Sequence, residues 1–168
     1  MEKKFILTDK FVINSFGIKL FQIKCTKSFK YAQKGDFGGY VEKEGNLDQE
    51  NDAWVFGNAR VFGNARVSGD ARVSGNAEVS GDARVYGNAE IDNNNKHCGF
   101  DCFGSANRHT HAYLTKENKV EITCGCFRGS IEEFEKRVEE THSGTIYEKQ
   151  YKAIIDVIKI KFGLTDLI

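Results

Sequence analysis

A six-residue repeat in the middle of the chain limits its fold more than any other feature. Seven successive hexads over residues 51–92 read NDAWVF, GNARVF, GNARVS, GDARVS, GNAEVS, GDARVY and GNAEID. Ala, a variable residue and Val or Ile alternate in each hexad, which is the pattern of a short strand with one buried face. The Gly-Asn or Gly-Asp pair that opens most hexads predicts a sharp corner. Each hexad is therefore expected to form one strand and one corner.

The strict period indicates how the hexads stack. A flat sheet of such short strands would bury little area, but three hexads that close a triangular coil stack Ala and Val into a continuous core. We therefore expect an 18-residue coil and a mainly β fold, with a short parallel β-helix of about three coils. A meander of β-hairpins is the alternative, but hairpins would not impose an identical six-residue period. Residues 39–44 and 45–50 are predicted to be two degenerate hexads that complete the third coil.

The hexads also resemble the bacterial transferase hexapeptide repeat. In that repeat an aliphatic residue is followed four positions later by a small one, as Val61 is followed by Ala65 here. The resemblance implies a left-handed parallel β-helix. The chain differs from that family in one respect, because its glycine stands two places after the aliphatic residue, where the family more often has it one place after.

An 18-residue coil predicts which outward side chains stack, at a spacing of about 4.8 Å. Arg60 is expected to stack with Glu78 as an opposite-charge pair, and Arg66 with Arg84 as a like-charge pair that an acidic partner would relieve. Aromatic side chains among arginines are typical of protein-binding hot spots. For Trp54 and Phe56, packing against the N-terminal segment is an equal alternative. The predicted partner-binding surface consists of Arg66, Arg84, Tyr86, Arg72, Phe62 and Trp54.

Three regions are expected along the chain. We expect an N-terminal β cap with a hairpin over residues 1–38 and the β-helix over residues 39–96. Residues 97–168 are expected to form a C-terminal α+β domain. The C-terminal domain is expected to contain a β-hairpin, a helix that begins at a Ser130–Glu133 capping box, and a second helix over about 147–162. We expect both helices to pack on the hairpin and close the coil. The alternative is that they form a dimer face, so the oligomeric state stays open.

Charge and hydrophobicity exclude several classes of function. The 24 basic and 24 acidic residues cancel, which argues against generic nucleic-acid binding and against attraction to an anionic membrane. No apolar run approaches the roughly 20 residues that cross a bilayer, so we expect a cytoplasmic protein. Five cysteines in such a chain predict reduced thiols or metal ligands ahead of a disulfide framework.

A candidate metal site lies between the repeats and the C-terminal helices. Thiolates and imidazoles bind Zn²⁺ tetrahedrally, and such an ion would pin the glycine-rich segment 97–109, which we expect to be a loop. We expect any such zinc to be structural, because no convincing general base accompanies it. Cys124 and Cys126 are expected to be packing residues instead. The predicted ligands are Cys98, Cys102, His109 and His111.

Enzymatic activity is not expected. Hexapeptide acyltransferases use a histidine on or near the coil to activate the acceptor, and residues 51–92 contain no histidine. An acyltransferase-like enzyme therefore remains an alternative rather than the primary hypothesis.

Three stretches together resemble a class of uncharacterised phage and prophage proteins. These stretches are QKGDFGGYVEKEGNLDQENDAWVFGNARV, CGCFRGSIEEFEKRVEETH and EKQYKAIIDVIKIKFG. Such proteins combine hexapeptide-type repeats with a GCFxG(T/S) C-terminal domain, so the resemblance implies a viral origin and a β-helix but no reaction. By analogy with compact phage proteins that block host defence, anti-CRISPR proteins included, we predict a non-enzymatic inhibitor of a host protein such as a CRISPR nuclease effector. A structural phage component is a further alternative.

Overall fold

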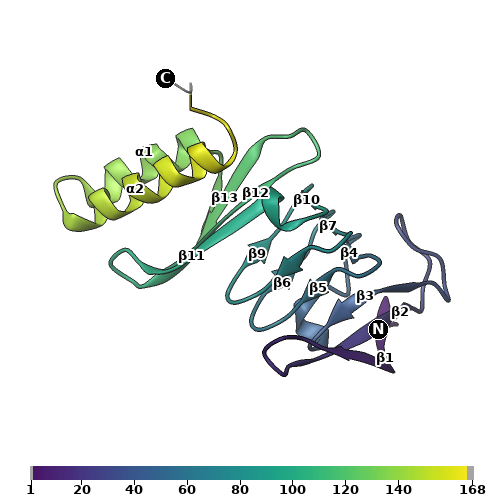
Figure 1. Ribbon diagram of the computed structural model, residues 1–168. Coiled ribbons are helices and arrows are strands. Elements are labelled where there is room, and N and C mark those ends of the chain that lie inside the picture. Colours follow the sequence, from purple (N-terminus) through teal and green to yellow (C-terminus); the bar gives the residue numbers. More distant parts are fainter. Residues whose placement is uncertain (1, 166–168) are drawn as a thin grey trace. The chain divides into compact units, whose positions relative to one another are not determined.

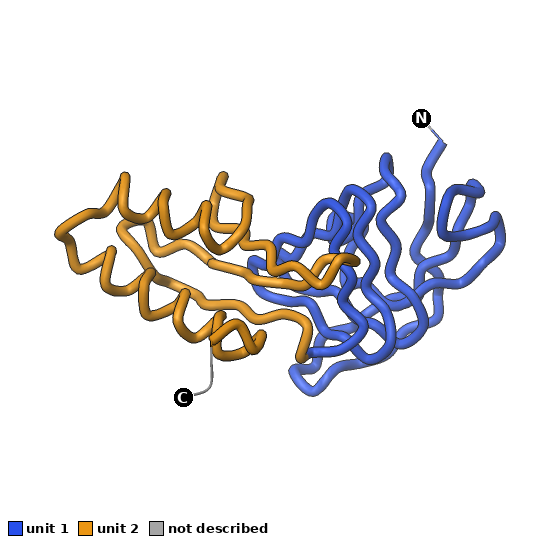
Figure 2. Tube along the Cα trace, turned by 90° about the horizontal axis from the view of Figure 1, so that it is seen from above, with its two compact units in different colours: residues 1–94 blue, residues 95–168 orange. Residues whose placement is uncertain are grey.

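The computed structural model describes residues 2–165 and divides the chain into two compact units, shown in Figure 2. The repeat unit, residues 1–94, holds the N-terminal strands and the hexads. The C-terminal unit, residues 95–168, holds the remaining strands and both helices. Neither of the helices described is long and apolar enough to cross a bilayer.

The hexads form short parallel strands whose partners lie 18 residues apart. Val61 pairs with Val79, Val67 with Val85, and Val55 with Val73. This parallel register confirms the predicted spacing and rules out the hairpin meander, which would pair neighbouring hexads antiparallel. The strands form the ladders β4-β7-β10, β5-β8 and β6-β9. The first and the last of these ladders are labelled in Figure 1. The strands are β4 (Trp54–Val55), β5 (Arg60–Val61), β6 (Arg66–Val67), β7 (Arg72–Val73), β8 (Glu78–Val79), β9 (Arg84–Val85) and β10 (Glu90–Ile91).

The interior of the repeat unit is made of the two apolar positions of each hexad. Every alanine from Ala53 to Ala89 in this register, and every valine or isoleucine that follows two positions later, is no more than 2% exposed. Burial of a valine or isoleucine side chain contributes roughly 1.5–3 kcal/mol. The repeated Ala and Val therefore supply a continuous core, as the alternation predicts.

Glycine makes the corners because the backbone there is left-handed. Gly69 has a φ of +73°, and the glycines that open the neighbouring hexads also have positive φ angles. A Cβ atom on Gly69 would lie 2.9 Å from the backbone nitrogen of Gly87, the glycine stacked on it. The corner therefore requires glycine both for its backbone angle and for the close approach of successive layers.

The first layer of the stack is formed by the two degenerate hexads. Val41, at the end of β3 (Phe37–Val41), pairs with Val61, and Leu47 forms a parallel bridge with Val67. Both offsets are 20 residues rather than 18, so this layer contains two additional residues between Leu47 and β4. The prediction that residues 39–50 stack under the regular hexads is confirmed, with this insertion as the difference.

The side chain of Asn46 links the first layer of strands to the second layer by hydrogen bonds. It belongs to the 3₁₀ turn η1 (Glu44–Asn46) and is fully buried. Its Nδ2 donates to the backbone oxygens of Gly63 at 3.2 Å and Ala65 at 2.8 Å. The side-chain amide therefore satisfies carbonyl groups that would otherwise be buried without a donor.

Lys4 also donates hydrogen bonds to buried backbone oxygens, in this case at the two-residue insertion between Leu47 and β4. Its Nζ donates to the backbone oxygens of Asn51 at 2.5 Å and Ala53 at 2.9 Å, and the residue is 5% exposed. Burial lowers the pKa of Lys4 to about 8, against the opposing attraction of the carboxylates of Asp48 and Asp52. The ammonium group is thus held inside because it completes the hydrogen bonding of the irregular layer.

The N-terminal hairpin extends the β5-β8 ladder. β1 (Phe5–Ile13) pairs antiparallel with β2 (Lys19–Cys25), and β2 pairs antiparallel with β3. The resulting sheet has the order β1-β2-β3-β5-β8. The free edge of the first parallel strand is therefore covered by the hairpin, which removes a site for edge-to-edge aggregation.

The C-terminal unit contains an antiparallel sheet of four strands rather than a two-stranded hairpin. β11 (His97–Phe103), β12 (Arg108–Leu114), β13 (Val120–Cys124) and β14 (Phe127–Gly129) follow one another in this order. The expectation of a loop over residues 97–109 is wrong, because residues 97–103 alternate as a strand does. Cys98 and Phe100 pack against the apolar core, and Gly99 pairs with His111.

Two helices cover one face of this sheet (Figure 1). α1 (Ile131–His142) begins at the predicted capping box, in which Ser130 Oγ accepts from Glu133 N at 3.2 Å and Glu133 Oε2 accepts from Ser130 N at 2.8 Å. α2 (Ile146–Lys161) follows after a short turn. Its buried residues Tyr151, Ile154, Ile155 and Ile158 join the core shared with the sheet.

Candidate binding surfaces

Outward arginines on two of the three ladders are neutralised by the residue stacked on them. Arg60 Nη1 lies 2.9 Å from Glu78 Oε1, and Arg72 Nη1 lies 3.4 Å from Glu90 Oε1. All four side chains are about one third exposed. The Arg60–Glu78 pair confirms the predicted stacking of opposite charges, and the two pairs leave little net charge on either ladder.

The β6-β9 ladder differs because both of its outward residues are arginine. Arg66 and Arg84 are directly opposite each other in the parallel register, and both are exposed. Within residues 2–165, no ion pair or side-chain hydrogen bond is found for Arg66. Stacked like charges are unfavourable by themselves, so an acidic surface placed against them gains free energy. We call Arg66 and Arg84 the basic rung.

Tyr86 lies at the end of the same ladder. It follows Val85, whose carbonyl accepts a hydrogen bond from Ser68 N at 3.0 Å, and it is half-buried. Tyr86 is therefore placed two residues after Arg84 of the basic rung and is partly exposed.

Two predicted surface residues are buried, and for them the prediction of a partner contact is wrong. Trp54 is 1% exposed because the rings of Phe5 and Phe29 pack edge-on against it, with centroids 6.2 and 5.3 Å away. Phe62 is 6% exposed. For Trp54 the alternative of packing on the N-terminal segment is confirmed, since both covering rings come from that segment.

Arg72 is also engaged within the repeat unit. Its guanidinium carbon lies 5.4 Å from the centre of the Tyr31 ring and 5.3 Å from that of Phe56, in addition to its ion pair with Glu90. Tyr31 and Phe56 contact each other at 6.3 Å. Arg72 thus holds the N-terminal segment on the ladder, which leaves the basic rung and Tyr86 as the accessible part of the predicted surface.

The four predicted zinc ligands are not brought together. Cys98 packs on the helix side of the sheet, where burial raises the pKa of its thiol to about 11. His111 pairs with Gly99, the next residue along, so its side chain lies on the opposite face. Cys102 is exposed, with a left-handed φ of +63°. Among the residues described, no group of three or more His, Cys, Asp and Glu side chains has a geometry suited to a metal ion.

Three histidines gather instead on the face of the sheet away from the helices. His97 Nδ1 lies 3.0 Å from His111 Nε2, and the rings of His109 and His111 have centroids 5.7 Å apart. His109 Nδ1 contacts Asp101 Oδ1 at 2.5 Å. His109 and His111, placed on one side of a strand by the sequence, are thus held by ring stacking and by hydrogen bonds.

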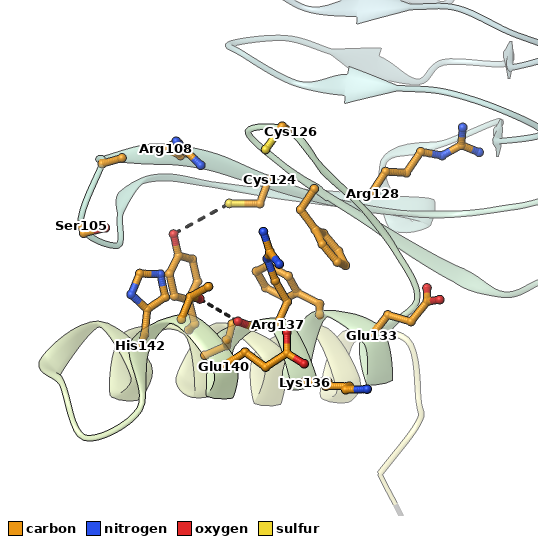
Figure 3. A pocket seen from close by; sticks show the side chains of 16 residues that line it. Ser105, Arg108, Cys124, Cys126, Arg128, Glu133, Lys136, Arg137, Glu140 and His142 are labelled. Carbon is orange, nitrogen blue, oxygen red and sulfur yellow. Dashed lines mark hydrogen bonds between the residues drawn. The ribbon is translucent and has the colours of Figure 1, made fainter.

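The C-terminal unit contains a pocket that the sequence did not indicate (Figure 3). It has a volume of about 630 Å³ and lies between α1 and the turns that join the strands. Its buried base includes Cys124, Phe134, Val138 and Tyr151. Burial, together with the nearby Cys124 thiol, raises the pKa of Tyr151 to about 12, so its hydroxyl stays protonated at neutral pH.

Four basic side chains line this pocket, and they differ in their partners. Arg128 is held by Glu121, with Nε 2.7 Å from Oε1 and Nη2 3.2 Å from Oε2. Arg108, Lys136 and Arg137 form no ion pair within the described part of the chain. Figure 3 shows Arg137 directed from α1 toward the strands, where Cys124 lies. The pocket therefore carries uncompensated positive charge above an apolar base.

No local motif marks Arg108 and Arg137, because they are 29 residues apart in the sequence and line the same pocket only after folding. The sequence feature that comes closest to marking the pocket is Gly125, which forms a turn with a φ of +60°. A Cβ atom there would lie 2.8 Å from Arg108 Cδ, so the glycine leaves room for the arginine side chain to cross the turn.

Comparison with known proteins agrees with the repeat architecture. A family model described as the YdcK β-solenoid repeat matches residues 53–69 and 65–81, which belong to the regular hexads. A comparison with curated proteins gives no match. The similarity and the 18-residue parallel register together support a repeat protein of the β-solenoid kind.

Proposed function

We propose that this protein acts by binding another protein through the basic rung, and that it is not an enzyme. The observation that carries the proposal is the register of Arg66 and Arg84, two exposed arginines that are directly opposite each other on one ladder. Tyr86, two residues after Arg84, adds a partly exposed aromatic residue. Arginine and tyrosine are enriched among residues that dominate binding energy at protein interfaces.

We further propose that the partner is a host defence protein, such as a CRISPR nuclease effector, and that the protein is phage-encoded and works in the host cytoplasm. The resemblance of residues 33–61 and of the C-terminal stretches to phage and prophage proteins supports this origin. In this proposal the hexads wind as a left-handed β-helix of about three coils, and the partner presents an acidic surface to the basic rung.

The proposal is tested by phage plating on cells that carry a CRISPR system directed against the phage. Expression of the protein is expected to restore plaques. Arg66→Glu combined with Arg84→Glu is expected to weaken binding to the purified effector by at least about tenfold, since charge reversal sets like charges against the partner.

The matched control is Lys27→Glu combined with Lys34→Glu. Both lysines are exposed in the repeat unit, and the change in net charge is the same. This control is expected to retain binding and plaque formation. Equal loss in both double variants would show that overall charge, rather than the basic rung, controls binding. Full inhibition by the Arg66/Arg84 variant would place the contact elsewhere.

A further inference from the structure

We propose that the pocket of the C-terminal unit binds a small phosphate monoester attached to a flat ring, with the phosphate between Arg108 and Arg137. This inference is independent of the basic rung, because all the residues that line the pocket belong to residues 95–168. Nucleotides and aryl phosphates share this chemistry, and the experiment below distinguishes them.

The charge of the pocket favours a dianion. Arg108 lines it from the start of β12 and Arg137 from α1, and neither has an acidic partner among residues 2–165. Two guanidinium groups that line one hollow repel each other, and an anion between them removes this cost. A phosphate monoester carries a charge of about −1.5 to −2 near neutral pH, which matches two arginines, and guanidinium groups bind its oxygens in pairs.

The acidic residues of the pocket do not supply that anion. Glu133 is occupied at the start of α1, where its Oε2 accepts from Ser130 N at 2.8 Å. Glu140 is exposed on α1. In Figure 3 it lies on the helix, away from Arg108. Neither glutamate therefore neutralises the positive charge of Arg108 and Arg137 in the pocket.

The base of the pocket suits a flat ring. Phe127 and Phe134 have ring centroids 5.0 Å apart, and Tyr151 packs edge-on against Phe134 at 5.6 Å. His142 lies nearly parallel to Tyr151, at 5.5 Å with 30° between the ring planes. Phe134 and Tyr151 are buried beneath this cluster, so a ligand ring would stack on the half-buried rings of Phe127 and His142. Such stacking is worth about 1–3 kcal/mol for a nucleobase. The imidazole nitrogens of the half-buried His142 also offer hydrogen bonds to a ring that carries heteroatoms.

The size of the pocket limits the ligand to a small molecule. A volume of about 630 Å³ falls within the range of about 300–1,000 Å³ that is usual for small-molecule sites. A nucleoside monophosphate has the phosphate, the ring and the size that these three observations require.

The test is a titration of the full-length protein followed by ¹H–¹⁵N correlation spectra. The probes are adenosine 5′-monophosphate, phenyl phosphate, adenosine and inorganic phosphate. At least one monoester is expected to saturate with a Kd below about 1 mM and to shift the amides of Gly125, Cys126 and Phe127. Adenosine and inorganic phosphate are each expected to bind at least about tenfold more weakly, because each lacks one half of the ligand. The tighter of the two monoesters identifies the source as a nucleotide or an aryl phosphate.

Variants assign the binding to the two arginines. Arg137→Ala and Arg108→Ala are each expected to weaken the binding of the monoester by about tenfold or more. Arg137→Lys is expected to weaken this binding less, because lysine keeps the charge but not the paired hydrogen bonds. Lys27→Ala, at an exposed position of the repeat unit, is expected to leave the affinity unchanged, and the spectra of all variants report whether they remain folded. The proposal is overturned if neither monoester shifts these amides at about 5 mM, a concentration well above the expected Kd. It is equally overturned if inorganic phosphate binds as tightly as the monoesters, or if folded Arg137→Ala and Arg108→Ala bind like the unaltered protein.

Discussion

At the scale of single residues, the environment of an outward side chain depends on the residue 18 positions away. Arg60 and Arg66 occupy the same place in successive hexads that differ by one residue, GNARVF and GNARVS. Arg60 meets Glu78 in an ion pair, whereas Arg66 meets Arg84. Small differences between hexads therefore decide which residue an outward arginine is stacked on.

Inward residues are expected to tolerate change far less than outward ones. Val73 is fully buried between Val55 and Ile91 of its ladder. Val73→Asp buries an unpaired charge, which costs several kcal/mol, so the repeat unit is expected to lose its cooperative thermal transition in circular dichroism. Ser68→Asp places the same charge on an outward, half-buried position and is expected to keep that transition. Normal melting of Val73→Asp would contradict the inward assignment of this valine.

The buried Lys4 predicts a dependence of stability on pH. Its pKa is lowered from 10.5 to about 8, so between these values the unfolded chain holds a proton that the folded chain has released. The free energy of unfolding is therefore expected to rise as the pH increases from about 8 to 10.5, by at most about 1.4 kcal/mol per pH unit. Chemical denaturation of the protein and of Lys4→Met across this range measures the contribution, since groups common to both cancel. A difference between the two that stays constant with pH would refute the burial of a charged Lys4.

The stacking partner of a single residue can be predicted from the sequence where the repeat alone determines the residue's position. The stacking of Arg60 on Glu78 and of Arg66 on Arg84 follows from counting along the sequence. The burial of Trp54 does not, because the rings that cover it, Phe5 and Phe29, come from a segment whose path no local pattern reveals.

At the scale of elements, local signals predicted the helices and longer-range pairing decided the strands. The capping box places the start of α1 correctly, and α2 begins within one residue of its predicted start. The sequence predicts a loop in place of β11 because the glycines of segment 97–109, Gly99 and Gly104, are typical of loops. Its pairing with β12 and the packing of Phe100 on the core override that preference.

The capping box gives a prediction for the C-terminal unit. Ser130→Ala removes the acceptor for Glu133 N and is expected to cost about 1 kcal/mol, which lowers the melting temperature by a few degrees. Ser143→Ala, beyond the last turn of the same helix, is the matched control, because no hydrogen bond of its side chain is found in residues 2–165. Equal melting temperatures of the two variants would show that the cap contributes nothing to the stability of the C-terminal unit.

At the scale of the whole molecule, the two candidate binding sites lie in different units and were not equally predictable. The basic rung could be found from the sequence because a repeat converts sequence spacing into spatial spacing. The pocket could not, because Arg108, Arg137 and Tyr151 belong to three elements without a common period. Its existence depends on how α1 and α2 pack on the sheet.

The most direct test of the account is the spatial register of the hexads, measured by disulfide formation. In a background of Cys102→Ser and Cys126→Ser, which removes the two exposed thiols, Arg66→Cys and Arg84→Cys place two thiols on adjacent parallel strands. Strands about 4.8 Å apart satisfy disulfide geometry. Mass spectrometry after mild oxidation is expected to show an intramolecular disulfide for this pair and none for Arg66→Cys with Glu78→Cys, which lie on different ladders. A disulfide in the second pair but not in the first would contradict the 18-residue register, and with it the basic rung.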